Sequence, residues 1–339
     1  MGSDARASFA ALRRAGHLTH IVDESHFVPT EWRTFAGRIV RKLMRPVMVN
    51  ELRHRVSTVL RSMQPDAVFV FKGNYVTREI LSDVRAAGAR SIMYYPDVSF
   101  HTHGKEIPLA LPHYDHVFTA KTFGVADMTA HGVRSVSFLP PGFDPEIHRP
   151  MELVDTDRQR FECDVSFIGT WSPKKEELLA SLHAAVPSAR MRIWGNQWEK
   201  RTGHALDDVV MGGEITGDDY ARAICGSHIC LGILSEQRKG ASSGDLITAR
   251  TFQIPACGGF MLHEHTDEAA LYFAEDEEAG FFRSTEDLAD KVRAYLSDDT
   301  RRRQIADAGH RRSIESDYSI DARMRHVAAY VRDGMAGKQ

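Results

Sequence analysis

The residues best suited to chemistry in this sequence lie in one run, residues 245–264, which reads DLITARTFQIPACGGFMLHE. Ionisable and hydroxyl side chains come first, including Asp245 and Arg250, and apolar residues, the small trio Ala-Cys-Gly and a strand-like GFMLH follow. The simplest interpretation is a helix, a tight turn ending at Gly258 and a buried strand. Because a helix N-terminus carries unpaired N–H groups and a partial positive charge, the run predicts a site for a phosphate-bearing ligand.

Three segments together resemble a known family. They are RTFQIPACGGFMLHE (residues 250–264), DVSFIGTWSPKKEELLASL (residues 164–182) and RIWGNQW (residues 192–198). In this order and at these distances they resemble the CgeB-like glycosyltransferases, a GT-B group named after a spore maturation protein. The resemblance is strong from about residue 160 to residue 330 and looser before that. It implies an α/β fold of GT-B type, with two Rossmann-like domains and an interdomain cleft.

The resemblance also implies roles for particular residues. The family motif usually reads RTFEIPACG, so Gln253 stands where the family carries the Glu that holds the donor ribose hydroxyls. Asp245 lies eight residues earlier, so the family's E-x7-E spacing is present here as D-x7-Q. Asp245 would face the hydroxyls of the transferred sugar. A neutral amide in place of a carboxylate predicts weaker or altered donor binding, because charged acceptors form the stronger hydrogen bonds.

Further donor contacts are expected at the ends of other predicted elements. Gly169 would let the backbone approach a ligand, and Lys174 or Lys175 would meet the diphosphate. Trp194 and Asn196 stand where the base commonly stacks in the fold. Arg238 and Lys239 lie in the polar loop 235–245 and are candidate phosphate clamps. Alternatively, the two lysines face solvent, Trp194 is a core residue, and Arg238 and Lys239 are charges on a mobile loop. The candidate donor-binding set is therefore Gly169, Lys174, Trp194, Asn196, Arg238, Arg250, Gln253 and Gly258.

The first half of the chain offers one candidate for acceptor chemistry. Asp97 follows the apolar strand-like segment 90–100, and parallel sheets bind ligands at the carboxyl ends of their strands. Asp97 would orient the acceptor hydroxyl or act as a base; the alternative is a capping or turn residue. His101 and His103 lie just beyond it, but no third metal ligand is recognisable, so we expect no metal site.

Composition limits the classes of protein that this chain can belong to. Its 339 residues suggest two domains, and 42% hydrophobic with 26% charged residues is a typical globular profile. No apolar run approaches a membrane span, and the N-terminus does not resemble a signal peptide. The four cysteines show no CxxC spacing, so we expect them to be reduced and the protein to be cytoplasmic. The net charge of −3 combines +5 for residues 1–150 with −8 for the remainder.

Alternating patterns predict the elements that position these residues. In the first domain, residues 1–148, a helix within 7–17 leads into a strand at 18–22, and four strands follow within 65–73, 90–100, 114–120 and 135–142. No strand precedes the first helix, which favours a truncated or misassigned start. The proline-rich run 139–150 is the expected domain boundary. The second domain, residues 149–339, repeats the pattern with strands at 164–169, 189–195, near 234 and at 280–282, and a last helix near 318–333 that packs back toward the first domain.

Residues 32–63 form the most basic segment, with eight Lys or Arg residues and Glu51 as their one acid. Apolar residues at helical spacing predict two surface helices broken near Pro46. One interpretation is a solvated arginine face. The other is a peripheral patch that meets anionic lipid or a charged acceptor.

The resulting hypothesis is a hexosyltransferase-like enzyme that moves a sugar from a nucleotide diphosphate donor to an unidentified acceptor, without a metal or another cofactor. Asp97, Asp245 and Arg250 are the candidate catalytic residues, and no nucleic-acid partner is expected. Two alternatives stay open: a nucleotide-sugar-binding protein without turnover, and a GT-B-type sugar-nucleotide epimerase.

Overall fold

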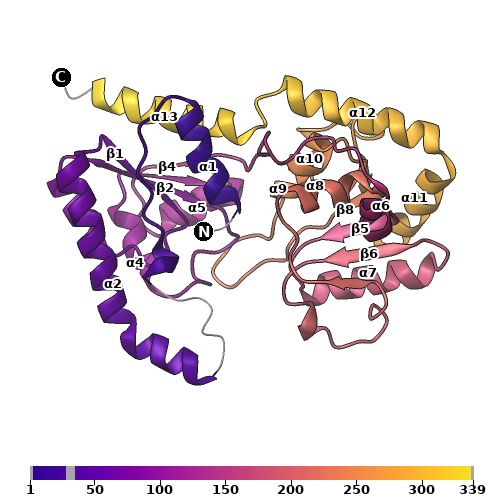
Figure 1. Cartoon of the computed structure of the whole chain (residues 1–339), viewed down its shortest axis with the longest axis horizontal. Helices are drawn as coiled ribbons and strands as arrows, with labels where there is room; N and C mark the ends of the chain where they lie inside the picture. Colours follow the sequence, from indigo (N-terminus) through magenta and orange to yellow (C-terminus); the bar gives the residue numbers. More distant parts are fainter. Residues whose placement is uncertain (1–2, 28–34, 337–339) are drawn as a thin grey trace. The chain divides into compact units, whose positions relative to one another are not determined.

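The structure is a computed structural model that describes residues 3–27 and 35–336. Two units make up the chain (Figure 1). The first unit holds the residues up to Pro140, the segment Gln237–Ser243 and the residues from Arg323 onward; the second holds Pro141–Glu236 and Gly244–Ala322. The division thus falls inside the predicted proline-rich run, at Pro140 rather than near residue 148.

The first unit is built on a parallel four-stranded sheet. Its strands are β1 (Ala67–Phe71), β2 (Arg90–Tyr95), β3 (His116–Thr119) and β4 (Val136–Phe138), and they pair in chain order. The predicted strands of this region are therefore confirmed. They form because β-branched and aromatic residues dominate each run, and β2 and β3 are almost wholly buried. The connecting helices are α3 (Arg78–Ala86), α4 (Glu106–Ala110) with the short helix η2 (Leu111–His113), and α5 (Thr122–Ala130).

The predicted strand at residues 18–22 was wrong. Helix α1 (Ser3–Arg14) is followed by irregular chain up to the short helix η1 (Glu24–His26). Leu18, at the start of the predicted strand, is 88% exposed. A strand of this sheet would bury it, so a brief apolar alternation was mistaken for a core strand.

Helix α2 (Phe35–Met63) is a single helix of 29 residues and not two, although Pro46 lies inside it. Pro46 is exposed, so its ring and the missing N–H are accommodated without disturbing a packed face. The second half of α2 is anchored by Leu52 and Leu60, which are 3% and 4% exposed. Leu60 packs with Val84 of α3 and Ala89. Arg33 of the basic segment 32–63 lies outside the described residues.

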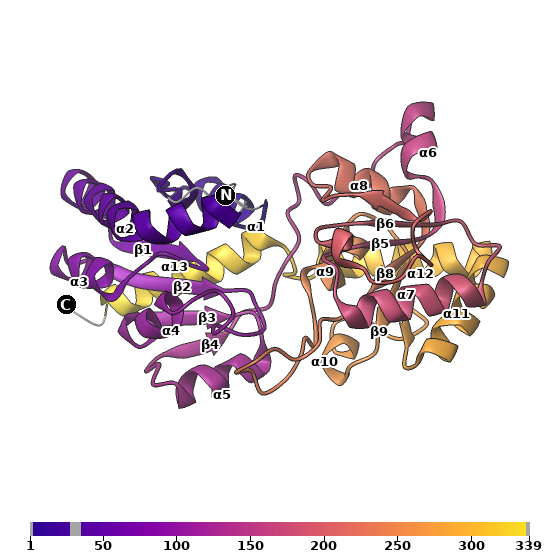
Figure 2. The same ribbon diagram turned by 90° about the horizontal axis from the view of Figure 1, so that it is seen from below.

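The second unit contains a six-stranded sheet, also parallel throughout, in the order β10-β9-β8-β5-β6-β7. The strands are β5 (Cys163–Ile168), β6 (Met191–Trp194), β7 (Val210–Gly212), β8 (Ser227–Gly232), β9 (Met261–Glu264) and β10 (Gly280–Phe282). Their helices are α6 (Asp155–Phe161), α7 (Pro173–Ala185), η3 (Trp198–Lys200), α8 (Asp218–Cys225), α9 (Ala249–Ala256), α10 (Asp267–Ala270), α11 (Thr285–Ser297) and α12 (Asp299–Glu315). Figure 2 shows α7 and α8 on opposite sides of strands β5 and β6.

Two segments of the second half of the chain belong to the first unit. Helix α13 (Ile320–Ala336) lies against its sheet, where the ring of Tyr330 stacks 4.1 Å from that of His116. Arg90 of β2 donates to the carbonyl of Tyr330 at 3.4 Å. The segment Gln237–Ser243 is held by a hydrogen bond of 2.7 Å from the Ser99 hydroxyl to the carbonyl of Lys239.

Two leucines of α2 should respond very differently to truncation. We expect Leu60→Ala to lower the free energy of unfolding by about 2–5 kcal/mol, because it removes buried methyl groups from the contact with α3. Leu43→Ala in the same helix should change it by less than about 0.5 kcal/mol, because Leu43 is 73% exposed. Urea unfolding followed by circular dichroism measures both. Equal losses would mean that the first half of α2 is packed in solution.

Candidate functional site

The second sheet contains a point at which the chain reverses its direction of winding. From β5 the chain moves outward to β6 and β7, and it then returns to the other side of β5 to form β8, β9 and β10. At such a point the connections after the two central strands leave toward opposite faces, which opens a crevice beyond their carboxyl ends. Open α/β sheets bind ligands there, so the loops after β5 and β8 define the candidate site.

Arg250 occupies this reversal point. It is in the first turn of α9, and its guanidinium donates to the carbonyl of Ile168 at the end of β5 (3.3 Å) and to that of Ile233 just after β8 (2.7 Å). The group also lies 5.3 Å from the centre of the Phe167 ring. Among the described residues no carboxylate comes within ion-pair distance of it. The guanidinium is thus fixed, cationic and only partly satisfied.

The electrostatics of Arg250 favour an anion. Burial lowers the pKa of its guanidinium, and Tyr220 and Asp245 act in the opposite direction. An arginine keeps its proton even so, because its pKa in water is far above neutral. A desolvated cation without a paired carboxylate costs free energy, and an incoming phosphate would remove that cost. The N-terminus of α9, beside Arg250, adds a partial positive charge.

A glycine makes the approach of Arg250 possible. A Cβ at Gly169 would lie 2.9 Å from the Arg250 Nη1 atom and 2.7 Å from the Phe167 ring. Gly195 in the neighbouring loop, with φ at +148°, would place a Cβ 2.0 Å from the carbonyl oxygen of Gly169. The loops after β5 and β6 therefore meet backbone to backbone. Gly169, expected as a place of close backbone approach, has that geometry, although its neighbours are protein atoms.

The start of α9 is oriented by a buried hydrogen-bond chain. The N–H of Thr248 donates to the Thr251 hydroxyl at 3.0 Å, and that hydroxyl lies 2.9 Å from Nε2 of His263. Nδ1 of His263 lies 2.6 Å from the carbonyl of Glu264. Burial lowers the pKa of His263 to about 4, so the ring is neutral. Nδ1–H then donates to the carbonyl, and Nε2 accepts from Thr251.

This chain of hydrogen bonds is tightly packed against strand β8, and it was not predicted from the sequence. His263 is fully buried, and a Cβ on Gly232 of β8 would lie 2.3 Å from its ring. The chain therefore ties the N-terminus of α9 to the end of β9. A histidine within an otherwise apolar strand, GFMLH, was the available signal, but only the tertiary contact with Thr251 gives it a role.

Lys174 and Glu264 form an ion pair at the same edge of the sheet. The Lys174 ammonium in the first turn of α7 lies 2.6 and 2.9 Å from the two carboxylate oxygens of Glu264 at the end of β9. Glu264 also accepts the N–H of Leu234 at 3.0 Å. Lys174, predicted to meet a diphosphate, is thus paired with a carboxylate. Half-exposed pairs contribute about 0–1 kcal/mol, so a phosphate can compete for the ammonium.

The two residues of the D-x7-Q motif lie on either side of the start of α9. Asp245 precedes the helix, exchanging hydrogen bonds with Ser235: its N–H donates to the Ser235 carbonyl at 2.8 Å and its Oδ2 accepts the Ser235 N–H at 3.3 Å. Gln253 lies within the helix and is 7% exposed. Its side-chain amide has no hydrogen-bond partner among residues 3–27 and 35–336. A buried amide without a partner is a candidate for a ligand contact.

Four other predicted donor contacts lie in the following surroundings. Trp194 is 4% exposed and packs near Phe161, because its strand β6 is covered on both faces; its ring offers no open face to a base. Gly258 has φ at +75° and ends α9, so it lies about 14 Å from the start of that helix. Arg238 belongs to the segment Gln237–Ser243, which clusters with the first unit. Asn196 is exposed and donates to Glu214 at 3.0 Å.

In the first unit, Asp97 forms the centre of a charged cluster just after β2. Its Oδ2 lies 2.7 Å from the Lys72 ammonium and 3.0 Å from Nε2 of His103. Burial alone would raise the pKa of Asp97, but the His103 hydrogen bond and the Lys72 charge lower it to about 2. Lys72 was not predicted. It adopts φ of +65°, a conformation that costs a non-glycine residue about 1–2 kcal/mol.

His101 does not join this cluster. Its ring stacks 4.4 Å from that of Phe100 and lies against Gly240, where a Cβ would come within 2.5 Å. Across the described residues no three His, Cys, Asp or Glu side chains gather as metal ligands would. The cluster therefore presents one carboxylate, one ammonium and one imidazole whose Nδ1 has no partner within the described part of the chain.

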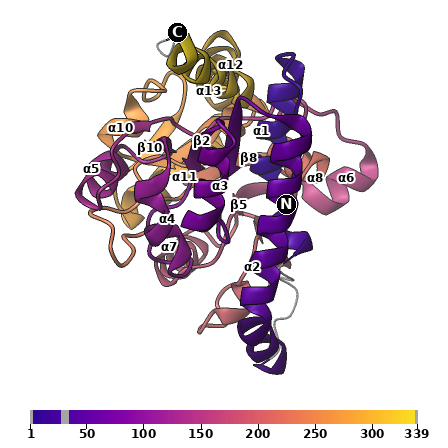
Figure 3. The same cartoon turned by 90° about the vertical axis from the view of Figure 1, so that its left-hand side faces the viewer.

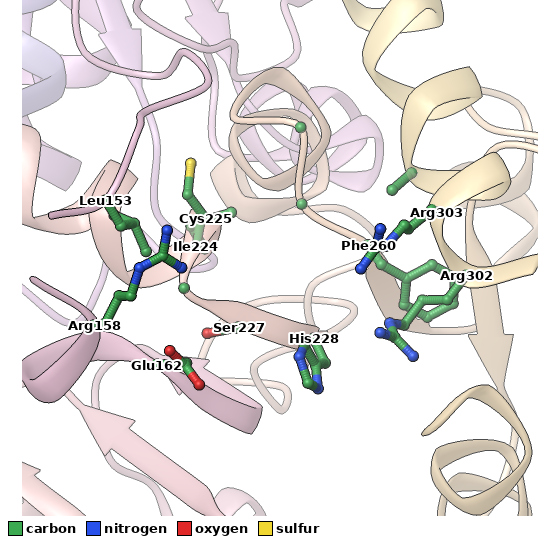
Figure 4. A pocket seen from close by; sticks show the side chains of 14 residues that line it. Leu153, Arg158, Glu162, Ile224, Cys225, Ser227, His228, Phe260, Arg302 and Arg303 are labelled. Carbon is green, nitrogen blue, oxygen red and sulfur yellow. The ribbon is translucent and has the colours of Figure 1, made fainter. Parts of the chain in front are cut away.

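A cavity of about 380 Å³ lies at the other edge of the second sheet. Its lining includes Ser227 and His228 at the amino end of β8, together with Arg158 and Arg302 (Figure 4). One strand length, about 20 Å, separates the amino end of β8 from Ile233. The cavity is therefore distinct from the reversal point, and Arg302 within it already binds the carbonyl of Tyr295 at 2.7 Å.

Buried neutral histidines should make the protein sensitive to acid. Burial lowers the pKa of His148 and of His263 to about 4, from 6.5. Below pH 6.5 the unfolded chain takes up protons that the folded protein refuses, so stability falls between pH 6.5 and 4 by up to about 1.4 kcal/mol per pH unit for each histidine. Urea unfolding between pH 7.5 and 5.5 measures this slope. His263→Gln should reduce it.

The matched control for this measurement is His204→Gln, because the His204 side chain is 95% exposed. That variant should keep the slope of the parent protein. An identical slope in His263→Gln and the parent would show that His263 is protonated in the folded protein.

Comparisons with known proteins agree with this architecture. Residues 173–329 match a protein family described as glycosyl transferase-like. No curated relative matches the chain in sequence. Solved structures match most of it: sucrose-phosphate synthase from Thermosynechococcus elongatus (12% identity, TM-score 0.60, 88% of this chain and 80% of that one), and Anabaena Alr3699/HepE in complex with UDP and glucose (12%, 0.61, 82% and 81%). A glycosyltransferase from Rickettsia africae also matches (10%, 0.61, 96% and 87%).

These likenesses establish the fold, and the finer resemblance to CgeB-like proteins stays a prediction. The predicted α/β class with two parallel sheets is confirmed. The chain has the GT-B fold of solved glycosyltransferases, and its residues 173–329 match the glycosyl transferase-like family.

Proposed function

We propose that this protein is a glycosyltransferase that uses a nucleotide diphosphate sugar as its donor. The observation that carries the proposal is the guanidinium of Arg250, held by two strand-end carbonyls at the reversal point of the second sheet. The match of residues 173–329 to a glycosyl transferase-like family supports it. The Anabaena neighbour of the same fold was solved with UDP and glucose, which makes uridine diphosphate donors the first to test.

The proposed reaction forms a bond between an acceptor hydroxyl oxygen and the anomeric carbon of the sugar. The bond from that carbon to the diphosphate oxygen breaks, its electron pair leaves with the diphosphate, and the proton of the acceptor hydroxyl passes to a phosphate oxygen of the leaving group or to solvent. Charge therefore develops on phosphate oxygens, and a fixed cation with an adjacent helix N-terminus stabilises it. Arg250 and the start of α9 supply both, so this proposal assigns no metal and no cofactor to the step. Asp245 would contact the sugar hydroxyls, and Gln253 the ribose.

Asp97 is our candidate residue for the acceptor. With a pKa of about 2 it is a poor proton acceptor near neutral pH, so orienting the acceptor hydroxyl suits it better than removing the proton. The acceptor class that we propose is a cell-surface polysaccharide, a glycolipid or a protein, glycosylated from the cytoplasmic side, and the transferred sugar is a hexose.

Replacing Arg250 tests the donor site. We expect Arg250→Ala to weaken UDP binding by about 10- to 100-fold, because hydrogen bonds to charged groups contribute about 1.5–3 kcal/mol. Arg250→Lys keeps the charge but loses the two-pronged contact to the strand ends, and it should be intermediate. Isothermal titration calorimetry with UDP, GDP and CDP measures the affinities, and release of nucleoside diphosphate from a donor panel measures turnover with and without EDTA.

The control is Arg190→Ala, an exposed arginine before β6 at the amino edge of the same sheet. If a folded Arg250→Ala protein bound UDP with unchanged affinity, the diphosphate would not bind at the reversal point. Donor binding without release of diphosphate would favour the binding protein, and an epimerised sugar without an acceptor would favour the epimerase.

Gln253→Glu tests the ribose contact. We expect about tenfold tighter binding of the nucleotide diphosphate, because a carboxylate accepts the ribose hydroxyls more strongly than an amide. We also expect the free variant to be less stable, since the side chain is only 7% exposed and its charge would be buried. Calorimetry and thermal unfolding with and without UDP separate the two effects. Equal affinity for UDP in both proteins would exclude Gln253 from the ribose.

A further inference from the structure

The first half of α2 carries a stripe of uncovered apolar side chains. Its members are the large hydrophobic residues of segment 39–47, and each is well exposed: Ile39 (46%), Val40 (44%), Leu43 (73%), Met44 (43%) and Val47 (62%). Their spacing of three and four residues places them along one side of a helix. We call these five residues the α2 stripe. Apolar residues in such a cluster mark an interaction surface, whereas single exposed ones do not.

The stripe points away from the body of its own unit. The second half of α2 packs through Leu52 and Leu60. Leu43 precedes Leu52 by nine residues, and at 100° per residue the two side chains leave the helix about 180° apart. Figure 3 shows the end of α2 that begins at Phe35 extending past α3 and α4. The α2 stripe is thus not a continuation of the packed face.

The charge of this segment indicates the partner. Residues 33–50 contain five Lys or Arg residues (Arg33, Arg38, Arg41, Lys42 and Arg45) and no Asp or Glu, in a chain whose net charge is −3. By helical geometry Arg45 leaves α2 about 160° away from Leu43, and Lys42 leaves it about 100° away. Arg45 lies 3.5 Å from Glu106 and over the Tyr75 ring, so one cation stays with the protein.

We propose that the α2 stripe docks the protein on an anionic lipid bilayer, with α2 lying in the plane of the interface. An apolar side with cations on the opposite side is the pattern of interfacial helices, which insert the apolar side and draw the cations toward acidic headgroups. Among residues 3–27 and 35–336, no helix has both the length and the hydropathy of a membrane span. The docking needs no donor or turnover, so it stands independently of the proposed function.

A second copy of the chain is the competing occupant of the α2 stripe. Two copies that met through this stripe would bring two cationic segments together, and like charges at close range oppose association. An acidic bilayer has the opposite sign and supplies an apolar layer. Charge complementarity therefore favours the bilayer.

Co-sedimentation of the full-length protein with vesicles tests the proposal. We expect binding to phosphatidylcholine vesicles that contain phosphatidylglycerol, and at least about tenfold weaker binding to phosphatidylcholine alone or at high salt. The double variant Leu43→Ser/Val47→Ser should lose at least about tenfold in binding, because it removes the two most exposed side chains of the stripe. Lys42→Glu should also weaken binding to the acidic vesicles.

The matched control is Leu109→Ser, which changes an exposed leucine (54%) in α4 of the same unit, outside the α2 stripe. It should bind vesicles as the parent protein does. Circular dichroism of each variant shows that α2 is still folded. The proposal is overturned if the parent protein does not bind the vesicles, or if the double variant binds them as well as the parent does. It is also overturned if sedimentation velocity shows a dimer of the parent that the double variant converts to a monomer.

Discussion

The candidate site depends on one interaction, the contact of the Arg250 guanidinium with the carbonyls that end β5 and β8. These two strands are neighbours in the sheet but far apart in the chain, and the winding direction reverses between them. The Arg250 side chain bridges their ends at the reversal point. Gly169 must lack a side chain for this contact to form. The topology of the sheet and the chemistry of the site are thus set by the same few atoms.

The position of α9 follows from a second constraint. Thr251 and the neutral ring of His263 link the start of this helix to the end of β9, and Gly258 in a left-handed conformation ends it. The partial positive end of α9 therefore lies at the carboxyl edge of the sheet with Arg250, Lys174 and Glu264. Of the two cations at this edge, Arg250 is held by two carbonyls, and Lys174 by the partly exposed pair with Glu264 and by the carbonyl of Leu234.

The first unit provides different chemistry. Its charged cluster, Asp97 with Lys72 and His103, follows strands β1 and β2, and its longest helix exposes the α2 stripe to solvent. A carboxylate fixed by an ammonium and an imidazole is suited to orienting a hydroxyl.

The sequence by itself determined the alternation of buried strands and helices in both halves, because continuous apolar runs bounded by Gly and Pro have few other solutions. It also predicted that residues 245–264 would hold the site, since a polar helix start between two buried strands has a fixed place in a parallel sheet. Only the tertiary structure decided which side chains face that site. Trp194 packs in the core, Lys174 pairs with Glu264, and His263 supports α9, because each depends on a contact between residues distant in the chain. For the same reason the segment 18–22 is not a strand, and Pro46 does not end α2. A local sequence pattern predicts an element, but the packing around the segment determines whether that element forms.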